Sequence, residues 1–471
     1  MTLIKSISGI RGTIGGTTGE NLTPIDAVKF AAAYGVWIKQ QREKENYRVV
    51  VGRDARISGA MIQNLVMNTL IGQGIDVIDL GLSTTPTVEV AVPMEHADGG
   101  IILTASHNPK QWNALKLLDA DGEFLNAEEG AKILKIAEQS NIEFAEVDDL
   151  GEISINQAYI DLHIDEVLNL ELVNKKAIEQ ANFKVVVDGV NSTGGIAIPL
   201  LLERLGVEAV KLFCEPNGHF PHNPEPLKEH LTDLSKGVVK HHADFGIVVD
   251  PDVDRLAFMD EKGEMFGEEY TLVACADYVL SKTKGNTVSN MSSTRALRDV
   301  TEKHGGSYEA SAVGEVNVVN MMKKNRAVIG GEGNGGIIYP ELHYGRDALV
   351  GVALFLSLLA EKKISVSALR ASYPNYFMSK KKIQLTPDLD VDALLKTMES
   401  KYSNDNAVEK ITTIDGVKID FSNTWVHLRK SNTEPIIRIY TEAPSQEEAD
   451  NLADRIIGEI MEEAKIGYGK F

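Results

Sequence analysis

The chain is poor in cysteine and contains no long apolar run. Its 471 residues include only two cysteines, Cys214 and Cys275, and these do not have the spacing of metal ligands. This scarcity excludes a disulfide scaffold and favours a reducing compartment. The longest apolar stretch, residues 349–360, is too short to cross a bilayer and predicts a buried helix. Residues 1–12 lack the apolar segment of a signal peptide, so we expect a cytoplasmic protein.

Acidic residues outnumber basic residues in this chain. Lys and Arg total 48 against 68 Asp and Glu, which gives a formal net charge of −20. A chain this acidic repels nucleic acid and anionic membranes, so we expect neither as a partner. If the substrate is itself an anion, the basic groups that bind it must be clustered locally. The composition is that of a globular protein, and the length suits roughly three to four domains.

Expected strands and helices alternate over the first 370 residues, which predicts α/β units on mostly parallel sheets. The expected strands are 48–51, 75–80, 100–103, 183–188 and 245–250, and the expected helices are 59–71, 196–205, 270–281 and 295–304. In the last section we expect strands at 380–385, 425–428 and 436–440. A helix follows there, after the capping box Ser445-x-x-Glu448. These patterns place four domains at 1–150, 151–256, 257–370 and 371–471.

Ser106 lies in the most informative segment. Residues 101–109 read Ile-Ile-Leu-Thr-Ala-Ser-His-Asn-Pro, so a buried strand ends abruptly in a polar turn. The carboxyl end of a strand is where α/β proteins place their chemistry. The turn presents the hydroxyl of Ser106 and the imidazole of His107. Ser106 is therefore a candidate nucleophile.

A second candidate site follows the expected strand at 245–250. Asp250, Asp252 and Asp254 alternate along the chain, and three carboxylates so close together repel one another unless a cation lies between them. Oxygen ligands suit Mg²⁺. An EF-hand is the competing interpretation. It fails because Arg255 occupies the position that needs a glycine, and because a strand precedes the loop where a helix is required.

Residues 330–336 form a glycine-rich segment, Gly-Gly-Glu-Gly-Asn-Gly-Gly. Glycines allow a ligand to approach the backbone closely, and the side chains of Glu332 and Asn334 could bind sugar hydroxyls. The Walker pattern of a nucleotide-binding loop is not present, so a P-loop is excluded.

A fourth segment combines basic and hydroxyl groups. Residues 429–435 read Arg-Lys-Ser-Asn-Thr-Glu-Pro, and Arg438 follows closely. Singly, Arg429 and Arg438 would more often be surface charges. Together with Ser431, Asn432 and Thr433 they suit a phosphate, which arginine can bind with two parallel hydrogen bonds.

These four segments, in this order, resemble the loops of the α-D-phosphohexomutases, and the resemblance spans the whole chain. It implies three similar α/β domains with mixed, mostly parallel sheets and a smaller α+β C-terminal domain around a central cleft. It further implies that Ser106 carries a phosphoryl group and that Asp250, Asp252 and Asp254 hold a catalytic Mg²⁺, with Ser106 beside the metal.

The resemblance assigns the remaining site residues as well. It implies an active-site position for Arg11, proton transfer at the sugar hydroxyl for Lys116, and a position at the phosphoserine or metal loop for Arg255. His107 is equally well interpreted as a catalytic base or as a hydrogen-bonded turn residue. In the sugar-binding loop, Glu332 and Gly335 match the family. Asn334 and Gly336 replace its usual serine and histidine, so the identity of the sugar is not decided by this loop.

The implied reaction is a mutase reaction on a hexose or hexosamine phosphate, with a sugar 1,6-bisphosphate as intermediate and activator. The Thr-Glu-Pro ending of the fourth segment is most similar to the phosphoglucosamine mutases, so we expect interconversion of glucosamine 6-phosphate and glucosamine 1-phosphate. The alternative is a phosphoglucomutase/phosphomannomutase. A phosphatase that shares the metal site and a catalytically silent sugar-phosphate sensor are weaker alternatives. We expect a monomer or a homodimer.

Overall fold

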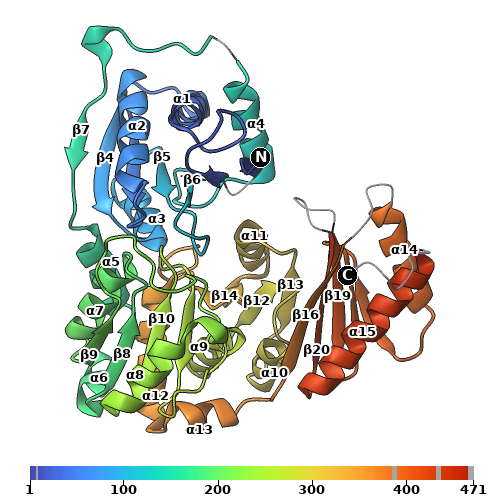
Figure 1. The fold of residues 1–471 in the computed structure, drawn as a ribbon. Helices are drawn as coiled ribbons and strands as arrows, with labels where there is room; N and C mark the ends of the chain where they lie inside the picture. Colours follow the sequence, from blue (N-terminus) through green and yellow to red (C-terminus); the bar gives the residue numbers. More distant parts are fainter. Residues whose placement is uncertain (7–8, 140, 385–389, 431–435, 465–471) are drawn as a thin grey trace.

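The computed structural model describes residues 1–6, 9–139, 141–384, 390–430 and 436–464. Its strands form one seven-stranded, two four-stranded and one five-stranded sheet. In Figure 1 the first sheet lies at the top, the second and third lie below it, and the fourth lies to the right. This arrangement confirms the expected three α/β domains and a smaller C-terminal domain. In the described part of the chain, every helix is too short or too polar to cross a membrane.

The first domain contains the seven-stranded sheet, in the order β1-β2-β6-β5-β3-β4-β7. Its strands are β1 (Ile4–Ser6), β2 (Gly9–Thr13), β3 (Tyr47–Arg53), β4 (Ile75–Leu82), β5 (Gly99–Leu103), β6 (Trp112–Leu118) and β7 (Ile153–Ile155). Its helices are α1 (Pro24–Gln41), α2 (Gly59–Gly72), α3 (Thr85–Met94), α4 (Ala127–Ala137) and the 3-10 turn η1 (Val147–Asp149). Because β7 pairs in parallel with β4, this sheet continues past our expected boundary at residue 150.

The second domain contains a four-stranded sheet in the order β11-β10-β8-β9. Its elements are α5 (Tyr159–Leu168), α6 (Lys175–Ala181), β8 (Lys184–Asp188), α7 (Gly194–Arg204), β9 (Glu208–Leu212), η2 (Lys228–His230), α8 (Thr232–His241), β10 (Phe245–Val249) and β11 (Leu256–Met259). We expected residue 256 to end this domain and the third domain to begin at residue 257. Instead β11 pairs antiparallel with β10, because the aspartate loop between them folds the chain back onto the same sheet.

The third domain has a four-stranded sheet in the order β13-β12-β14-β15. Its elements are α9 (Glu268–Lys282), β12 (Asn286–Asn290), α10 (Ala296–Lys303), β13 (Tyr308–Ser311), α11 (Glu315–Asn325), β14 (Ala327–Glu332), β15 (Gly336–Ile338), α12 (Ala348–Lys362) and α13 (Val366–Ala371). The side chain of Asp347 caps α12 by accepting hydrogen bonds from the N–H groups of Leu349 and Val350.

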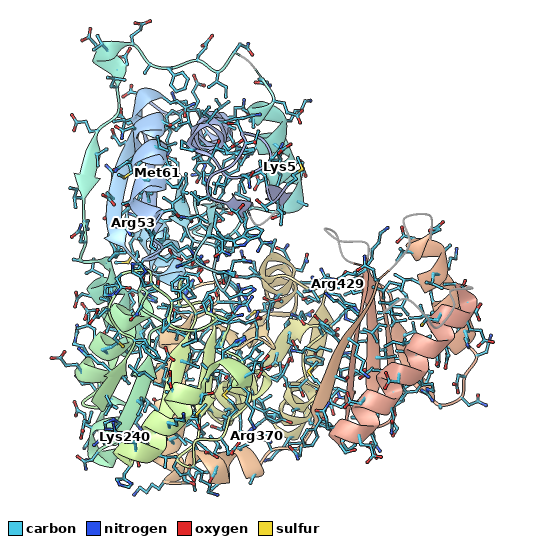
Figure 2. All side chains as sticks on the ribbon, viewed as in Figure 1. Lys5, Arg53, Met61, Lys240, Arg370 and Arg429 are labelled. Atoms are coloured by element: carbon cyan, nitrogen blue, oxygen red, sulfur yellow. The ribbon has the colours of Figure 1, made fainter. Side chains whose placement is uncertain are left out.

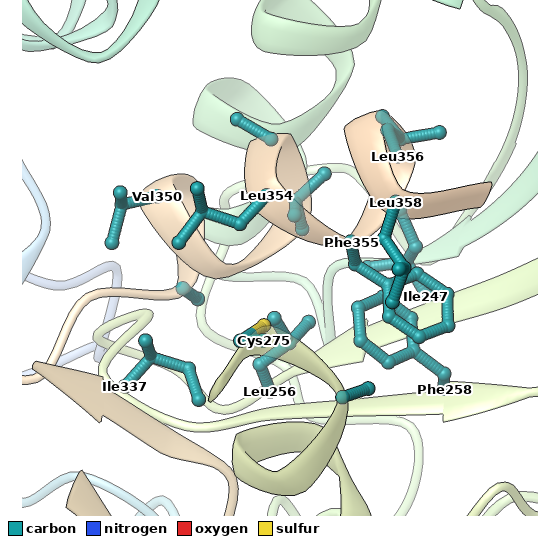
Figure 3. Packing of buried hydrophobic residues seen from close by; sticks show 14 of the residues in the cluster. Ile247, Leu256, Phe258, Cys275, Ile337, Val350, Leu354, Phe355, Leu356 and Leu358 are labelled. Carbon is teal, nitrogen blue, oxygen red and sulfur yellow. The ribbon is translucent and has the colours of Figure 1, made fainter. Parts of the chain in front are cut away.

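Helix α12 joins the second and third domains through one hydrophobic core. As expected for residues 349–360, every residue of this stretch is buried. Figure 3 shows α12 above Ile247 and Phe258 of the second sheet and Cys275 of α9. The rings of Phe258 and Phe355 stack with their centroids 3.7 Å apart. The two domains are therefore packed as one unit behind the aspartate loop.

The fourth domain is an antiparallel sheet in the order β16-β20-β19-β18-β17. Its elements are β16 (Phe377–Gln384), α14 (Val391–Tyr402), β17 (Val408–Thr412), β18 (Val417–Phe421), β19 (Trp425–Lys430), β20 (Ile436–Ala443) and α15 (Gln446–Glu463). Ser445 caps α15, as expected, by accepting a hydrogen bond from the N–H of Glu448. Figure 1 shows α14 and α15 on one face of this sheet and the third domain on the other.

Candidate active site

Ser106 lies three residues beyond β5, where the structure brings it against the second domain. Its Oγ donates a 2.7 Å hydrogen bond to Oδ2 of Asp250. Its backbone has a φ of +48°, in the left-handed region that non-glycine residues rarely adopt. Nδ1 of His107 lies 3.4 Å from the same Oγ. The hydroxyl is thus aimed at the aspartate loop by a strained turn, and such strain is typical of functional sites.

Arg56, which our sequence analysis missed, holds this turn in place. Its fully buried guanidinium donates hydrogen bonds to the backbone carbonyls of Ser106, Asn108 (2.7 Å) and Pro109 (2.8 Å). Nε of Arg56 also lies 3.0 Å from Oδ2 of Asp54. The segment from Gly52 to Arg56 could have indicated this role, because a charged pair directly after a buried strand needs partners inside the fold.

The three aspartates are brought together as expected, and all are fully buried. One oxygen of each lies within 4.8 Å of the others. Burial and the charges of Asp254 and Asp252 raise the pKa of Asp250 well above its ordinary value. Oδ1 of Asp252 and Oδ1 of Asp254 accept no hydrogen bond from the described residues. Buried carboxylate oxygens that lie this close together and have no hydrogen-bond partner fit a hard divalent cation such as Mg²⁺.

Lys116, on β6, lies beside this triad. Its Nζ is 2.7 Å from Oδ2 of Asp252 and 3.5 Å from Oδ2 of Asp254. Burial alone would lower the pKa of Lys116, but the two carboxylates outweigh it and raise that pKa above its ordinary value. The hydroxyl of Thr85 donates a 2.6 Å hydrogen bond to the same oxygen of Asp252. On the side of the first domain, the triad therefore contacts a partly buried cation, Lys116.

Arg346 connects the aspartate loop with the glycine-rich segment. Its guanidinium lies 2.7 Å from Oδ2 of Asp254, 2.8 Å from Oε2 of Glu315 and 3.0 Å from Oε2 of Glu332. We did not predict this residue as part of the site. The only sequence signal was the repetition of Gly-Arg-Asp-Ala at residues 52–55 and 345–348.

The glycine-rich segment comprises the end of β14, a turn at residues 333–335 and the first residue of β15. Oε1 of Glu332 accepts a 2.8 Å hydrogen bond from Nδ2 of Asn290, and Oδ1 of Asn334 accepts one from the N–H of Gly336. Gly335 has a φ of +83°, and a Cβ there would lie 1.9 Å from the carbonyl oxygen of Leu256. The glycine at this position is required by the close approach of β11.

Arg11 and Arg255 place two more cations near Ser106. Nη1 of Arg11 donates to Oδ1 of Asn108 at 3.3 Å. The backbone N–H of Arg255 donates to Oδ1 of Asp250 at 3.1 Å, and its guanidinium lies 3.3 Å from Oε1 of Glu225. Burial and the charge of Arg255 lower the pKa of Arg11. The same two causes, in the same order, lower the pKa of His107 to about 2, so this imidazole is neutral. A cluster of cations around a hydroxyl is the surrounding that a phosphoryl group needs.

The fourth domain contributes arginines at a separate place. Arg429 is opposite Arg438 in the register of β19 and β20. Nε of Arg429 lies 2.9 Å from Oδ2 of Asp415. Figure 2 shows Arg429 near the upper end of the fourth sheet. Ser431, Asn432 and Thr433 lie outside the described residues. The structure thus connects Ser106, Lys116, the aspartates, Arg255 and Glu332 through direct contacts, whereas Arg429 and Arg438 belong to another part of the surface.

Comparison with known proteins agrees with this layout. The phosphoglucomutase/phosphomannomutase models match in order: alpha/beta/alpha domain I at residues 3–143, domain II at 161–263, domain III at 267–376 and the C-terminal domain at 382–459. A phosphoglucomutase/phosphomannomutase of Thermococcus kodakarensis is 35% identical over 97% of this chain and 99% of its own length. The chain belongs to the phosphoglucomutase/phosphomannomutase family.

Other members of the family carry different names but also match nearly the whole chain. A Methanopyrus kandleri protein named "Probable phosphoglucosamine mutase" is 32% identical over 96% of both chains. The crystal structure of a family member from Burkholderia thailandensis matches 99% of both chains with a TM-score of 0.85 and 25% identity. As a member of this family, the chain is a phosphohexomutase enzyme.

Proposed function

We propose that this enzyme interconverts glucosamine 6-phosphate and glucosamine 1-phosphate by way of a phosphoryl group carried on Oγ of Ser106. The observation that carries the proposal is the 2.7 Å contact between this Oγ and Asp250, which joins the serine turn of the first domain to the aspartate loop of the second. A turn serine of merely structural role would not need a buried carboxylate from another domain.

The reaction consists of two transfers of opposite direction. In the first, the bond between phosphorus and Oγ of Ser106 breaks, a bond forms between phosphorus and the free hydroxyl oxygen of the sugar phosphate, and Oγ gains the proton that this hydroxyl loses. The product is a sugar 1,6-bisphosphate. In the second transfer, the other phosphoryl group of the turned bisphosphate passes to Oγ. A sugar 1,6-bisphosphate added from outside would activate unphosphorylated enzyme by the same step.

Phosphoryl transfer needs alignment and charge neutralisation from the protein. Asp250, Asp252 and Asp254 would hold Mg²⁺, which when bound withdraws charge from the phosphoryl oxygens. Arg11 and Arg255 add fixed positive charge beside Ser106, and Arg56 fixes the turn. Lys116 lies within 2.7 Å of Asp252, where its charge would neutralise a neighbouring phosphoryl oxygen.

Binding of the second phosphate group is assigned to the fourth domain. Arg429 and Arg438, with Ser431, Asn432 and Thr433, would bind whichever phosphate is not reacting. Glu332, Asn334 and Gly335 would contact the sugar hydroxyls, and the ion pair of Glu332 with Arg346 would hold that carboxylate while the sugar turns.

The amino sugar is favoured by the Thr-Glu-Pro ending of residues 433–435 and by relatives named as phosphoglucosamine mutases. One of these, from Sulfurisphaera tokodaii, carries the name phosphoglucosamine/phosphogalactosamine mutase at 32% identity. The Thermococcus relative named phosphoglucomutase/phosphomannomutase, at 35% identity, favours the alternative that the enzyme acts on glucose and mannose phosphates.

The test is a comparison of kcat/KM for glucosamine 6-phosphate, glucose 1-phosphate and mannose 1-phosphate, each with its matching bisphosphate, because specificity is a difference in transition-state binding. We expect the highest value for the glucosamine phosphate. A higher value for glucose or mannose 1-phosphate would establish the alternative. Release of free phosphate in place of an isomer would contradict both.

A further inference from the structure

A second cluster of metal-ligating side chains lies outside the proposed active site. Nε2 of His163 and Nε2 of His343 lie 2.8 Å and 3.1 Å from one oxygen, Oδ2 of Asp347. The side chains of His163 and Asp347 are fully buried and that of His343 is 11% exposed. One ligand atom from each of these residues lies within 4.8 Å of the others. Two imidazole nitrogens and a carboxylate oxygen therefore meet at one point.

The other polar atoms of this cluster already have partners. Nδ1 of His163 lies 3.0 Å from Oγ1 of Thr87. Oδ1 of Asp347 accepts hydrogen bonds from the first turn of α12, the N–H of Leu349 at 2.8 Å among them. Metal-binding histidines are usually oriented in this way, by a hydrogen bond to the ring nitrogen that does not contact the metal. The two Nε2 atoms are directed at Oδ2 of Asp347 and form hydrogen bonds with it in the structure.

Glu89 supplies an independent sign that a cation belongs here. It is only 1% exposed, and neither of its carboxylate oxygens has a hydrogen-bond partner among the described residues. Oε2 of Glu89 lies 3.4 Å from Nδ1 of His343, and Gly345 leaves the space for it. In the described part of the chain, the ion pairs of Glu89 and Asp347 are with histidines alone. Two buried carboxylates whose ion pairs are with histidines alone are costly unless a further positive charge is present.

We propose that His163, His343 and Asp347 bind a divalent transition-metal ion of the zinc class, with Glu89 as the second carboxylate that balances its charge. Imidazole nitrogen suits zinc and its neighbours in the first transition row, whereas Mg²⁺ prefers oxygen ligands. The aspartate triad and this cluster would therefore take different ions. The partial exposure of His343 gives the ion a route into the site.

The position of the cluster indicates a structural role. Glu89 lies on α3 of the first domain, His163 lies on α5 of the second, and His343 and Asp347 precede α12 of the third. Figure 1 shows α3 and α5 meeting where the first two domains join. Asp347 also directly follows Arg346, which contacts Asp254. A bound ion would fasten three domains together and fix the arginine that reaches the aspartate loop, whichever sugar the enzyme uses.

The experiment uses the full chain, stripped of metal with a chelator, transferred to buffer with saturating Mg²⁺ and titrated with Co²⁺. We expect visible ligand-field absorption that saturates at one equivalent and is displaced by Zn²⁺. His343→Gln, chosen because its side chain is the least buried of the three, should weaken Co²⁺ binding at least tenfold. The matched control is His304→Gln, since His304 pairs with Asp277 at 2.8 Å in a cluster with no second histidine. This control should bind Co²⁺ like the wild type.

A second measurement uses no substitution in the cluster, so its result does not depend on whether a cluster variant folds. One equivalent of Zn²⁺, added over saturating Mg²⁺, should raise the thermal midpoint of the wild-type chain, and should do so equally in Asp252→Asn. The proposal is overturned if the wild type shows no Co²⁺ absorption and no rise with Zn²⁺. It is also overturned if the folded His343→Gln variant binds Co²⁺ as tightly as the wild type, or if the effect of Zn²⁺ disappears in Asp252→Asn. None of these outcomes depends on mutase activity.

Discussion

Arg429 and Arg438 occupy directly opposed positions on β19 and β20. On the other side of Arg438, the register of β16 places Lys382 opposite it. Like charges directly across a sheet destabilise it, and here three cations follow one another across three strands. Asp415 pairs with Arg429 and offsets only part of this charge. Such a row is best explained by an anion that binds there, and in our proposal this anion is the non-reacting phosphate.

The first prediction is that this row of cations favours phosphate binding but lowers the stability of the fold. Arg438→Met should lower kcat/KM for the sugar phosphate by roughly 10- to 100-fold, mostly through KM, since a hydrogen bond to a charged group contributes about 1.5–3 kcal/mol. Its thermal midpoint should be equal to that of the wild type or higher, because a repulsive pair is removed. Steady-state kinetics and a thermal melt measure both. Lys410→Met, on the exposed strand β17 of the same sheet, is the control and should leave KM unchanged.

The second prediction concerns the aspartate triad. In Asp250→Asn the repulsion from Asp252 and Asp254 is reduced, so the thermal midpoint in the presence of a chelator should rise by about 2–5 °C, equivalent to about 1 kcal/mol or more. Mg²⁺ should stabilise the wild type but not this variant, and turnover should be lost. Thermal melts with Mg²⁺ and with chelator, on the wild type, Asp250→Asn and the exposed control Asp233→Asn, test this prediction. A variant that Mg²⁺ stabilises as strongly as the wild type would argue against the metal assignment.

The third prediction is a pH dependence at the interface of the third and fourth domains. Burial raises the pKa of Glu269 to about 8. Between its unfolded pKa of about 4.3 and this value, the folded state holds a proton that the unfolded state has released. The free energy of unfolding should therefore fall as the pH rises through this window, by at most about 1.4 kcal/mol per pH unit.

Glu269→Gln should remove this slope and be more stable than the wild type near pH 8. Thermal midpoints measured from pH 5 to pH 9 test it. Glu268→Gln is the matched control, because Glu268 lies at a similar distance from the same Lys380, 3.8 Å against 3.9 Å. An unchanged slope in Glu269→Gln would show that another group causes the dependence.

Much of the fold could be predicted because its signals are local. Residues 100–103 are uniformly apolar and end in a polar turn, and the structure has a fully buried strand there. The apolar run at 349–360 is a buried helix for the same reason. The boundary after residue 256 was misplaced because pairing of β11 with β10 depends on the loop geometry, which a run of apolar residues does not reveal.

The site was predictable where its residues are adjacent in the chain, as in the aspartate loop. Arg56 and Arg346 were missed because each acts through contacts with residues far away in the sequence, and the local signals at Gly52–Arg56 and at 345–348 do not show which residues those contacts involve. The cluster of His163, His343 and Asp347 was missed for the same reason, since His163 is about 180 residues away in the sequence from the other two. The central cleft and the roles of Ser431, Asn432 and Thr433 stay predictions.

The central claim is that Ser106 carries the phosphoryl group, and one measurement tests it most directly. The enzyme is incubated with a sugar 1,6-bisphosphate, freed of ligand and digested, and the peptide that contains Ser106 is analysed by mass spectrometry. We predict the added mass of one phosphoryl group on Ser106, its absence in a folded Ser106→Ala variant, and loss of turnover in that variant. An active wild-type enzyme without phosphate on Ser106, or a Ser106→Ala variant with wild-type turnover, would contradict the account.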